Sequence, residues 1–270
     1  MNALLETVRS GHYAKKQIHS RSALISWSHR GRFATGLRLA RRVGGTRVLD
    51  YGCGDGTFLA LLLQSESAEA EASALRPTRS AIKIAVGAEV NRSLVDDCRQ
   101  RFAGQAELKF ELVDDLNRPD AQGSFDTVYC MEVFEHVVEP APILDRLHRL
   151  LAPGGALVIS VPIETGLPVV VKQVVRRVAG WRGIGHYPGT TGYTAMELLR
   201  SVFAGSTQHI PRPVFANQDG SAFHDHKGFN WRVLRTLIEE RFELIQQTTS
   251  PFAGLGPQLG TQRWFIARKT

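Results

Sequence analysis

The residues best placed to do chemistry form a short run in which an acidic residue and three glycines alternate with other residues, Asp50-Tyr51-Gly52-Cys53-Gly54-Asp55-Gly56. The apolar residues before this run predict a strand, and Phe58 to Leu63 after it are predicted to form a helix. Glycine suits the turn between them because a Cβ would block the approach of a ligand to the backbone, and because tight turns often need a positive φ. The first N–H groups of the helix are then available to polar ligand atoms.

The acidic residue narrows the class of ligand. Dinucleotide-binding turns follow the pattern G-x-G-x-x-G, whereas this turn is G-x-G-x-G and has Thr57 where the third glycine would stand. Asp50 would repel a pyrophosphate, but it suits a ligand with an ammonium group and a sulfonium, and S-adenosylmethionine (SAM) carries both. The run resembles motif I of the class I SAM-dependent methyltransferases. This resemblance implies SAM as the cofactor, bound by Asp50, Gly52, Cys53, Gly54 and Gly56. An ordinary glycine turn is the alternative.

Two more acidic positions follow at predicted strand ends. Glu89 lies near the end of a strand predicted over residues 82–90, and a carboxylate there can accept hydrogen bonds from both ribose hydroxyls. It matches the acidic residue that the family has at this place. A third strand, residues 108–113, is closed by Asp114-Asp115-Leu116. The resemblance implies that one of the two aspartates, with its neighbours, meets the adenine edge. Which aspartate does so stays open, and exposed surface positions are the alternative for all three acidic residues.

A fourth strand and the loop beyond it are predicted over Phe125 to Val137, with the sequence FDTVYCMEVFEHV. This stretch resembles that of small-molecule methyltransferases, including the ubiquinone-pathway O-methyltransferases. Ligands of open α/β sheets bind outside the carboxyl ends of the strands. The resemblance therefore implies that Met131, Glu132 and His136 lie near the methyl group. Loop packing is the alternative for each of them.

Histidines are the candidates for a general base. Methyl transfer to a hydroxyl is helped by a base, and histidine is the usual choice near neutral pH. The candidates are His136 by its position, and His186, His224 and His226 in a later segment. The His224-x-His226 pair could instead bind a metal, but no further ligand has a recognisable spacing, so no metal site is predicted. Packing is the alternative for any one of these histidines.

Length and composition set bounds on the protein. A chain of 270 residues can bury one substantial core, with room for a cap but not for a second large domain. No apolar run is long enough to span a bilayer, and the first residues lack the apolar centre of a signal peptide. The three cysteines, Cys53, Cys98 and Cys130, are widely spaced. They argue against a disulfide framework or a zinc site, and they suit a reducing cytoplasm.

The net charge of +7 is unevenly distributed. Residues 7–49 contain ten lysines and arginines and no acidic residue, so the rest of the chain has 23 basic against 26 acidic residues. A basic segment of this kind can bind phosphates, anionic lipid or nucleic acid. A solvated helical face with apolar residues packed beneath it is the competing interpretation.

The order of the predicted elements indicates an α/β fold. It is a doubly wound, Rossmann-like, seven-stranded sheet, mostly parallel with an antiparallel edge strand, plus N-terminal helices and a cap insertion. The chain divides into an N-terminal helical lid segment (1–44), a SAM-binding core (45–162 and 230–270) and a cap insertion (163–229) that is expected to contact substrate. The core closes without residues 163–229, so this segment needs another reason to exist.

Further elements are predicted along the second half of the chain. A helix over 143–151 ends at a Pro-Gly-Gly turn, and a fifth strand follows over 156–161. The cap contains a basic amphipathic helix over 167–181 and a second helix over 194–203 that Thr194 and Glu197 cap. The helix over 230–241 and strands over 242–249 and 263–268 complete the core. The valines of 167–181 make this helix a lid, a peripheral membrane contact or a homodimer contact.

These observations predict a SAM-dependent methyltransferase that acts on a small-molecule, lipid or saccharide acceptor, at oxygen. An RNA methyltransferase, or a SAM-binding module that acts through partners, is the alternative. Amino-directed DNA enzymes of this superfamily carry a proline-rich loop after strand four, and Cys130-Met131-Glu132-Val133 stands there instead. Base N-methylation is therefore disfavoured, and nucleic acid is not the expected partner.

Overall fold

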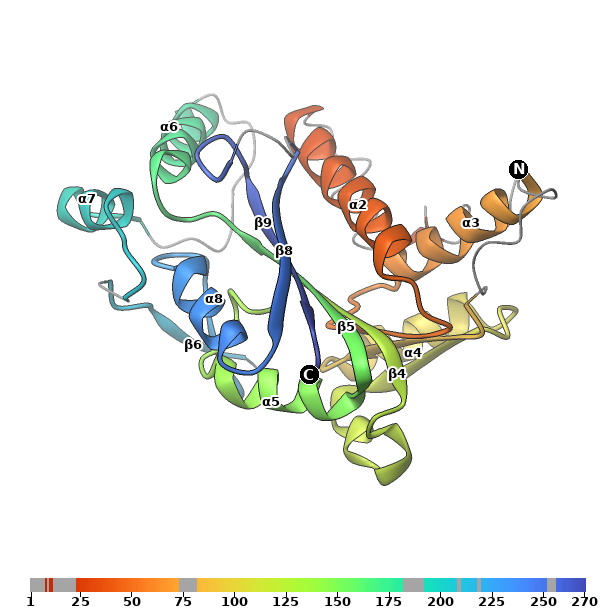
Figure 1. Ribbon diagram of the computed structural model, residues 1–270. Coiled ribbons are helices and arrows are strands. Elements are labelled where there is room, and N and C mark those ends of the chain that lie inside the picture. Colours follow the sequence, from red (N-terminus) through yellow and green to blue (C-terminus); the bar gives the residue numbers. More distant parts are fainter. Residues whose placement is uncertain are drawn as a thin grey trace. The chain divides into compact units, whose positions relative to one another are not determined.

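The structure is a computed structural model, and it describes residues 8, 10–11, 23–72, 82–181, 192–207, 210–217, 220–251 and 256–270. Seven strands form one sheet in the order β3-β2-β1-β4-β5-β9-β8 (Figure 1). β1 pairs in parallel with β2 and β4, β2 pairs in parallel with β3, and β9 and β8 make the antiparallel edge. The predicted fold class is confirmed. The strands are β1 (Arg47–Tyr51), β2 (Ile84–Glu89), β3 (Leu108–Leu112), β4 (Phe125–Met131), β5 (Leu151–Pro162), β8 (Glu243–Ser250) and β9 (Gln262–Arg268).

The helices alternate with these strands through the first half of the described chain, as a parallel sheet requires. Two short 3₁₀ helices, η2 (Val113–Asn117) and η3 (Pro119–Ala121), follow β3. A separate antiparallel hairpin is made by β6 (Val214–Ala216) and β7 (Ala222–His224). The α-helices are α2 (Ala23–Val43), α3 (Thr57–Ala72), α4 (Arg92–Arg101), α5 (Pro140–Leu150), α6 (Leu167–Trp181), α7 (Ala195–Val202) and α8 (Trp231–Glu239).

The chain forms two compact units. The first unit comprises residues 1–131, 146–159 and 266–270, and the second comprises residues 132–145 and 160–265. The predicted cap, residues 163–229, belongs entirely to the second unit. The boundaries of the lid, core and cap remain predictions. They describe functional segments of the chain, whereas the two units describe compactness.

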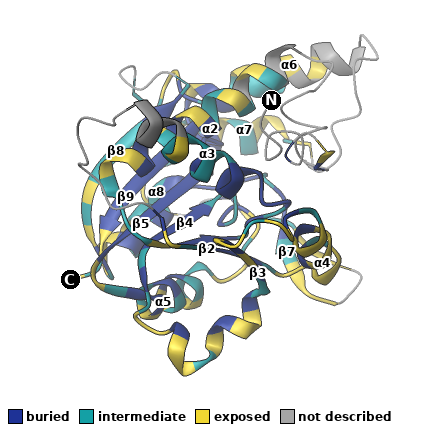
Figure 2. Ribbon diagram, turned by 90° about the vertical axis from the view of Figure 1, so that its right-hand side faces the viewer, coloured by how far each residue is buried: buried dark blue, intermediate teal, exposed yellow. Residues whose placement is uncertain are grey.

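The first unit is built on β1, whose last four residues are buried. Figure 2 colours the buried residues of the sheet dark blue. Such continuous burial is typical of a parallel strand that is covered on both faces. The register places Asp50 opposite Gly87 of β2 and opposite Tyr129 of β4. Asn91 caps α4 by accepting hydrogen bonds from the backbone N–H groups of Ser93 and Leu94. The sheet thus holds Asp50 rigidly at the start of the glycine turn.

The second unit carries the two helices of the predicted cap and the edge hairpin of the large sheet. Thr194 and Glu197 form the predicted capping box at the start of α7, and Asn230 caps α8 by accepting a hydrogen bond from the N–H of Arg232. The indole N–H of the fully buried Trp264 in β9 donates to the hydroxyl of Ser250 in β8 at 2.9 Å. In Figure 1, β8 and β9 run side by side at this end of the sheet order.

Two elements, β5 and a hairpin, differ from the prediction. The helix predicted from Phe58 extends to Ala72 as α3, because the Ser-, Ala- and Glu-rich stretch after Leu63 favours helix. β5 begins at Leu151 rather than Ala156, because the backbone of Gly154 and Gly155 exchanges hydrogen bonds with Lys269 at 3.1 and 2.9 Å. The β6–β7 hairpin was not predicted. In the described residues, no helix is long and apolar enough to cross a membrane.

Candidate functional site

The glycine turn after β1 adopts a backbone that favours glycine. Gly52, Gly54 and Gly56 have φ values of 78°, 56° and 73°, in the left-handed region where a Cβ is disfavoured. The N–H groups of Gly52 and Cys53 both donate to the carbonyl oxygen of Ala88 in β2, at 2.8 and 3.1 Å. The turn is therefore fastened to the end of the neighbouring strand and keeps one shape.

Glu89 holds this turn from the other side. Its Oε2 accepts a hydrogen bond from the N–H of Gly54 at 3.0 Å, and its Oε1 accepts from the N–H groups of Val90 and Asn91 at 2.9 and 3.2 Å. Each carboxylate oxygen has two lone pairs, so these backbone bonds leave acceptor capacity for the hydroxyls of a ligand. Sequence reasoning predicted a ribose-binding role for Glu89 but not its part in shaping the turn.

Asp50 is almost completely buried, with 2% of its surface exposed. Burial raises the pKa of its carboxyl group to about 7, and the negative charge of Glu89 adds to the rise, while Arg32 opposes it. Asp55 is also buried, and its Oδ1 accepts hydrogen bonds from the N–H and hydroxyl of Thr57. Three carboxyl groups thus lie around one turn. A group of carboxyl side chains suits a cationic ligand such as SAM and would repel a pyrophosphate.

Gly56 and Cys53 pack within the protein. A Cβ on Gly56 would lie 2.8 Å from the ring of Phe110 and 3.1 Å from that of Phe102, and one on Gly87 would lie 2.8 Å from the sulfur of Cys53. The two phenylalanine rings stack with their centroids 5.4 Å apart. Burial raises the pKa of the Cys53 thiol, so this group stays neutral. The structure therefore gives Gly56 and Cys53 a packing role beside their predicted contact with the cofactor.

The residues predicted to meet adenine lie on η2 and differ in their surroundings. Asp115 accepts a hydrogen bond from the N–H of Leu112 at 3.2 Å, so its carboxylate is engaged in the local turn. The side chain of Asp114 is 88% exposed, with a guanidinium nitrogen of Arg146 at 3.9 Å. Leu116 is buried. Both aspartates are exposed, and they differ in that the carboxylate of Asp115 is hydrogen-bonded to the local backbone.

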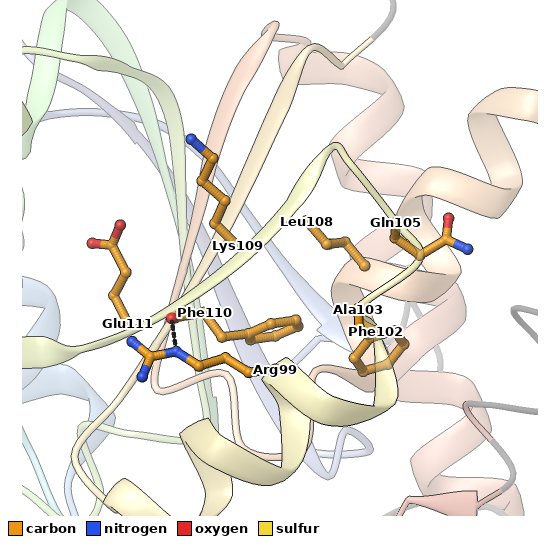
Figure 3. Close-up of a pocket in the computed structure, with 8 residues that line it drawn as sticks. All are labelled: Arg99, Phe102, Ala103, Gln105, Leu108, Lys109, Phe110 and Glu111. Atoms are coloured by element: carbon orange, nitrogen blue, oxygen red, sulfur yellow. Dashed lines mark hydrogen bonds between the residues drawn. The ribbon is translucent and has the colours of Figure 1, made fainter.

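A hollow lies beside these elements, between α4 and β3 (Figure 3). None of the residues predicted to bind the cofactor lines it. Its lining is an aromatic and apolar floor with a few charged side chains, and the Nε of Arg99 donates to the carbonyl oxygen of Phe110 at 2.9 Å. The lining residues are Arg99, Phe102, Ala103, Gln105, Leu108, Lys109, Phe110 and Glu111.

The backbone changes direction where β4 ends. Met131 is the last residue of the strand, and Glu132 follows with a φ of 57°, which is uncommon for a residue with a Cβ. Two hydrogen bonds to Ser160 hold this conformation. The N–H of Glu132 donates to the carbonyl oxygen of Ser160 at 2.9 Å, and its Oε1 accepts from the hydroxyl at 3.2 Å. Strain of this kind is often retained at functional sites.

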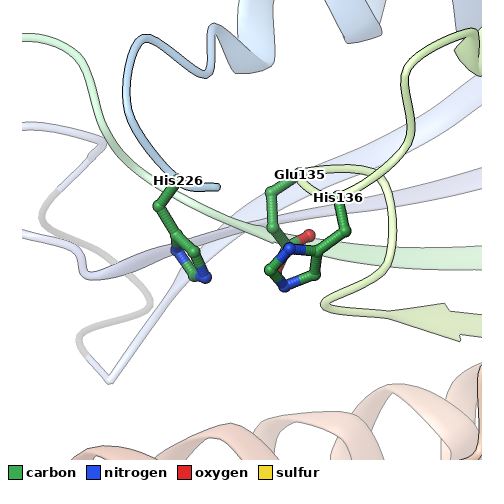
Figure 4. Close-up of side chains that lie close together, drawn as sticks. All are labelled: Glu135, His136 and His226. Atoms are coloured by element: carbon green, nitrogen blue, oxygen red, sulfur yellow. The ribbon is translucent and has the colours of Figure 1, made fainter. Parts of the chain in front are cut away.

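Three side chains of the second unit converge after this turn. Ligand atoms of Glu135, His136 and His226 all lie within 4.8 Å of one another, and Figure 4 shows the two rings beside the carboxylate. We call these three residues the Glu-His-His cluster. The imidazole rings of His136 and His226 meet edge to face, with centroids 5.0 Å apart. Glu135 is fully buried, His226 is partly buried and His136 is exposed, so the cluster is open on one side.

The backbone fixes the ring nitrogens of two histidines. Nδ1 of His136 lies 3.0 Å from the carbonyl oxygen of His224, and Nδ1 of His224 lies 2.7 Å from that of Pro213. A carbonyl oxygen only accepts, so each Nδ1 carries a hydrogen and Nε2 of the neutral ring has the lone pair. His224 is 8% exposed, which gives it a structural role. His186 lies outside the described residues.

Glu164 lies next to His226 of the cluster, and Lys172 is paired with Glu164. Oε1 of the buried Glu164 lies 3.9 Å from Nδ1 of His226, and it accepts a hydrogen bond from Nζ of Lys172 at 2.8 Å. Burial lowers the pKa of His226 to about 4, so its ring is neutral at physiological pH. Glu135, Glu164 and Lys172 were missed by sequence reasoning. The adjacent pair Glu135-His136, two residues of metal-ligand type, was the available signal.

Comparisons with known proteins agree with this fold. Residues 24–201 match the family model described as "Methyltransferase domain". A strand, an acid-lined glycine turn and a helix in a mostly parallel sheet define a SAM-binding α/β protein. The match covers more than half of the chain, so the chain belongs to the methyltransferase domain family, of the SAM-dependent class.

Curated relatives match a shorter stretch. Ubiquinone biosynthesis O-methyltransferases of Xanthomonas oryzae pv. oryzae (strain PXO99A) and Xanthomonas euvesicatoria pv. vesicatoria (strain 85-10) are 34% and 33% identical over 151 residues. Each alignment covers 54% of this chain and 56% of the relative. The chain therefore spans about half the length of the curated relatives it matches.

Solved structures share the fold over nearly the whole chain. PH0226 from Pyrococcus horikoshii OT3 has a TM-score of 0.53 at 13% identity and covers 93% of both chains. The N-methyltransferase NodS from Bradyrhizobium japonicum WM9, in complex with S-adenosyl-L-homocysteine, has a TM-score of 0.52 at 13% identity. It covers 99% of this chain and 96% of that chain. At these identities the likeness shows a common fold.

Proposed function

We propose that this protein transfers a methyl group from SAM to an oxygen atom of a small-molecule, lipid or saccharide acceptor. The observation that carries this proposal is the Glu-His-His cluster. It combines an accessible imidazole lone pair with a buried carboxylate directly after β4. Loops at the carboxyl ends of strands are where open α/β sheets bind ligands. The ubiquinone biosynthesis O-methyltransferases matched by this chain support oxygen as the acceptor atom.

The first unit would hold the cofactor through named atoms. Asp50 is the buried acid before the turn and would attract the positive charges of the ligand, since a nearby cation favours its ionised form. Glu89 would accept hydrogen bonds from the ribose, and Asp114, whose side chain is 88% exposed, would accept one from the exocyclic amine of adenine. The left-handed backbone at Gly52 and Gly54 lets the ligand approach the turn.

The protein need not form a covalent bond to either reactant in this reaction. SAM supplies a methyl group on a positively charged sulfur, which is already an excellent leaving group. The acceptor oxygen forms the new bond to carbon with its lone pair, the carbon–sulfur bond breaks with its electron pair kept by sulfur, and the hydroxyl proton leaves. The protein mainly aligns the reactants and removes that proton.

The Glu-His-His cluster would activate the acceptor hydroxyl. Among the four candidate histidines, His136 is exposed and has its Nε2 lone pair fixed in direction by the bond from Nδ1 to His224. His226 is neutral and partly buried beside it. His224 is engaged with Pro213, so it would act by holding the loop. His136 and His226 are therefore the residues that we place at the acceptor.

The cap would select an acceptor with an apolar portion. Val171 and Val174 of α6 are 61% and 57% exposed, and Met196 in α7 and Phe203 directly after it are exposed as well. Exposed apolar side chains that gather in a patch often mark binding surfaces. Contact with an anionic membrane surface, where a lipid acceptor would reside, fits this pattern better than a lid turned inward. A homodimer contact is the competing partner.

The test is the labelling of acceptors in crude extracts. Purified protein is incubated with methyl-labelled SAM and with metabolite and lipid extracts, and labelled products are identified by mass spectrometry. We expect at least one product labelled on oxygen, made by wild type and not by Gly54→Val. Label found on nitrogen would refute oxygen as the acceptor atom. SAM binding without a labelled product from any extract would instead favour a binding module.

A further inference from the structure

We propose that the Glu-His-His cluster of Glu135, His136 and His226 is a binding site for a divalent first-row transition-metal cation. The carboxylate and the two ring nitrogens lie within 4.8 Å of one another, and they come from two loops about ninety residues apart in the sequence. Two imidazoles and one carboxylate are a recurrent set of three protein ligands that leaves further coordination positions open. Figure 4 shows both rings and the carboxylate gathered around one point.

The two loops that carry the ligands are joined before any cation binds. The N–H of His224 donates to the carbonyl oxygen of His136 at 3.0 Å, and Nδ1 of His136 donates in return to the carbonyl oxygen of His224 at 3.0 Å. The guanidinium of Arg212 donates both to the carbonyl oxygen of Glu135 and to that of Asp225. These bonds place the residues that precede or follow each ligand. Metal sites need this kind of support to fix the directions of their ligands.

The ring of His136 is held in the form that a metal requires. Metal-binding histidines usually donate the hydrogen of one ring nitrogen to a backbone carbonyl or a carboxylate, and bind the cation through the other. His136 makes such a bond to His224 with Nδ1, so its lone pair is on Nε2, on the exposed side of the cluster. His226 faces the carboxylate of Glu164, 3.9 Å from its Nδ1. This distance is too long for a hydrogen bond, so Glu164 would act on this ring through its charge.

The charges around the cluster favour a cation. Glu135 and Glu164 are both buried, and the carboxylate of Glu132 is close enough to act on His226 as well. Two positive charges lie nearby: Arg212 donates to backbone carbonyl oxygens, and Lys172 is paired with Glu164. Three carboxylates near two imidazoles and two engaged cations form a site that a divalent cation would stabilise.

The ligand types select among cations. Mg²⁺ and Ca²⁺ prefer oxygen ligands throughout, whereas imidazole suits the later first-row metals. Two nitrogens and one oxygen therefore favour Co²⁺ or Zn²⁺ over Mg²⁺. The exposed side at His136 leaves room for an oxygen from another molecule.

The consequence for catalysis rests on the proposed function. A hydroxyl bound to such a cation has a lower pKa and reaches the reactive alkoxide form near neutral pH. His136 and His226 would then bind the cation, and the hydroxyl proton would pass to solvent. The acceptor is accordingly a molecule whose reacting hydroxyl can bind a metal, such as a phenol or a diol.

The decisive experiment measures the binding of metal without any acceptor. Tag-free protein is treated with a chelator, dialysed, and titrated calorimetrically with MnCl₂, ZnCl₂, CoCl₂ and MgCl₂. The visible absorption of bound Co²⁺ reports its nitrogen and oxygen ligands. The variants are His136→Gln and His226→Gln, and the matched control is Glu139→Gln, an exposed residue close in the chain. Thermal melts confirm that each variant folds, and His136 is exposed, so His136→Gln is expected to fold.

We expect wild type and Glu139→Gln to bind one transition-metal cation per chain, more tightly than Mg²⁺. Both histidine variants are expected to bind it at least tenfold more weakly. An absence of saturable binding to wild type, or an affinity of folded His136→Gln within twofold of wild type, overturns the metal site. SAM affinity is measured on the same samples. SAM binding by wild type without metal binding refutes only the metal site, and a failure to bind SAM refutes the proposed function.

Discussion

Replacing Asp50 with asparagine is expected to raise the free energy of unfolding at neutral and alkaline pH, although Asp50 is predicted to bind the cofactor. The carboxyl group lies within the buried strand β1, and burial together with the charge of Glu89 raises its pKa from 3.8 to about 7. The folded protein therefore holds this proton more tightly than the unfolded chain does. As the pH rises from about 4 to about 7, the unfolded chain loses the proton first, so the folded state becomes less stable.

The size of this effect follows from the shift. A difference of about three pKa units corresponds to about 4 kcal/mol, because each unit is worth about 1.4 kcal/mol. The penalty is absent below pH 4, grows through the interval between the two pKa values, and is complete above pH 7. The neutral amide of the Asp50→Asn variant would carry no such penalty. The variant should therefore gain up to about 4 kcal/mol over wild type at pH 8 and little at pH 4.

Urea unfolding of both proteins from pH 4 to pH 8 measures this difference directly. Asp126→Asn is the matched control. The backbone N–H groups of Thr46 and Arg47 donate to Asp126 and hold the pKa of its carboxyl group below its usual value. Asp126 therefore stabilises the fold above the pKa of the unfolded chain, and this stability is lost as the pH falls. The control should be less stable than wild type at pH 8 and should approach it at low pH, the opposite trend.

A difference between Asp50→Asn and wild type that stays constant from pH 4 to pH 8 would refute the raised pKa. SAM binding supplies a second readout, since a cationic ligand favours the ionised carboxylate. Calorimetry near pH 6.5, in buffers with different ionisation enthalpies, should show that wild type releases a proton on binding. The asparagine variant should release less and bind more weakly.

Three further outcomes are expected. Gly54→Val should abolish measurable SAM binding in calorimetry, because it places a side chain at a φ of 56° in the path of the ligand, whereas Gly104→Val, in open space, should bind normally. Glu89→Gln should weaken SAM binding ten- to a hundredfold, in keeping with about 1.5–3 kcal/mol for a charge-assisted hydrogen bond; a loss under twofold would mean that another residue holds the ribose. Val171→Asp/Val174→Asp should stop wild-type-like co-sedimentation with anionic vesicles while leaving SAM affinity unchanged. Wild type that stays in the supernatant at low salt would exclude membrane contact.

Charge reversal on α6 tests the predicted membrane contact only at a basic residue that makes no contact in the interior. Lys172 seemed from the sequence to be a surface charge, but its Nζ donates to the carbonyl oxygen of Ile163 at 3.0 Å and to the buried carboxylate of Glu164 at 2.8 Å. Reversing this charge would leave two carboxylates together in the interior, a strongly destabilising change. Arg177 is exposed, so Arg177→Glu is the variant that changes membrane affinity without disturbing the interior.

Local pattern was sufficient for most elements of the fold. The alternation of apolar strands and helices, the glycine turn and the cap at Thr194 are encoded within a few residues, and the structure has them where they were predicted. The error at the start of β5 arises from pairing between distant segments. The Pro-Gly-Gly stretch is a turn by composition, yet its backbone bonds to Lys269, more than a hundred residues later, extend β5 through it.

The candidate site divides in the same way. Asp50, the glycines and Glu89 follow one another at characteristic spacings, so the sequence could name them. The Glu-His-His cluster could not be recognised as a group. Each histidine was a candidate by itself. The sequence near the His224-x-His226 pair has no further metal-ligand residue at a recognisable spacing. In the folded protein, the loop after β4 brings Glu135 and His136 to His226, and His224 is not part of the cluster.

Several groups at these sites are in states that folding alone disfavours. Asp50 is buried at a pKa near 7, and Glu132 adopts a left-handed backbone that costs a residue with a Cβ about 1–3 kcal/mol. Glu135 puts a carboxylate where no part of the residue is exposed. Selection for stability would replace each with a neutral residue or a glycine. All three lie at or just beyond the ends of β1 and β4, where parallel strands present their carboxyl ends to ligands. Binding of charged ligands, a sulfonium at Asp50 and the proposed metal cation beside Glu132 and Glu135, would explain why residues that weaken the fold are found at these positions.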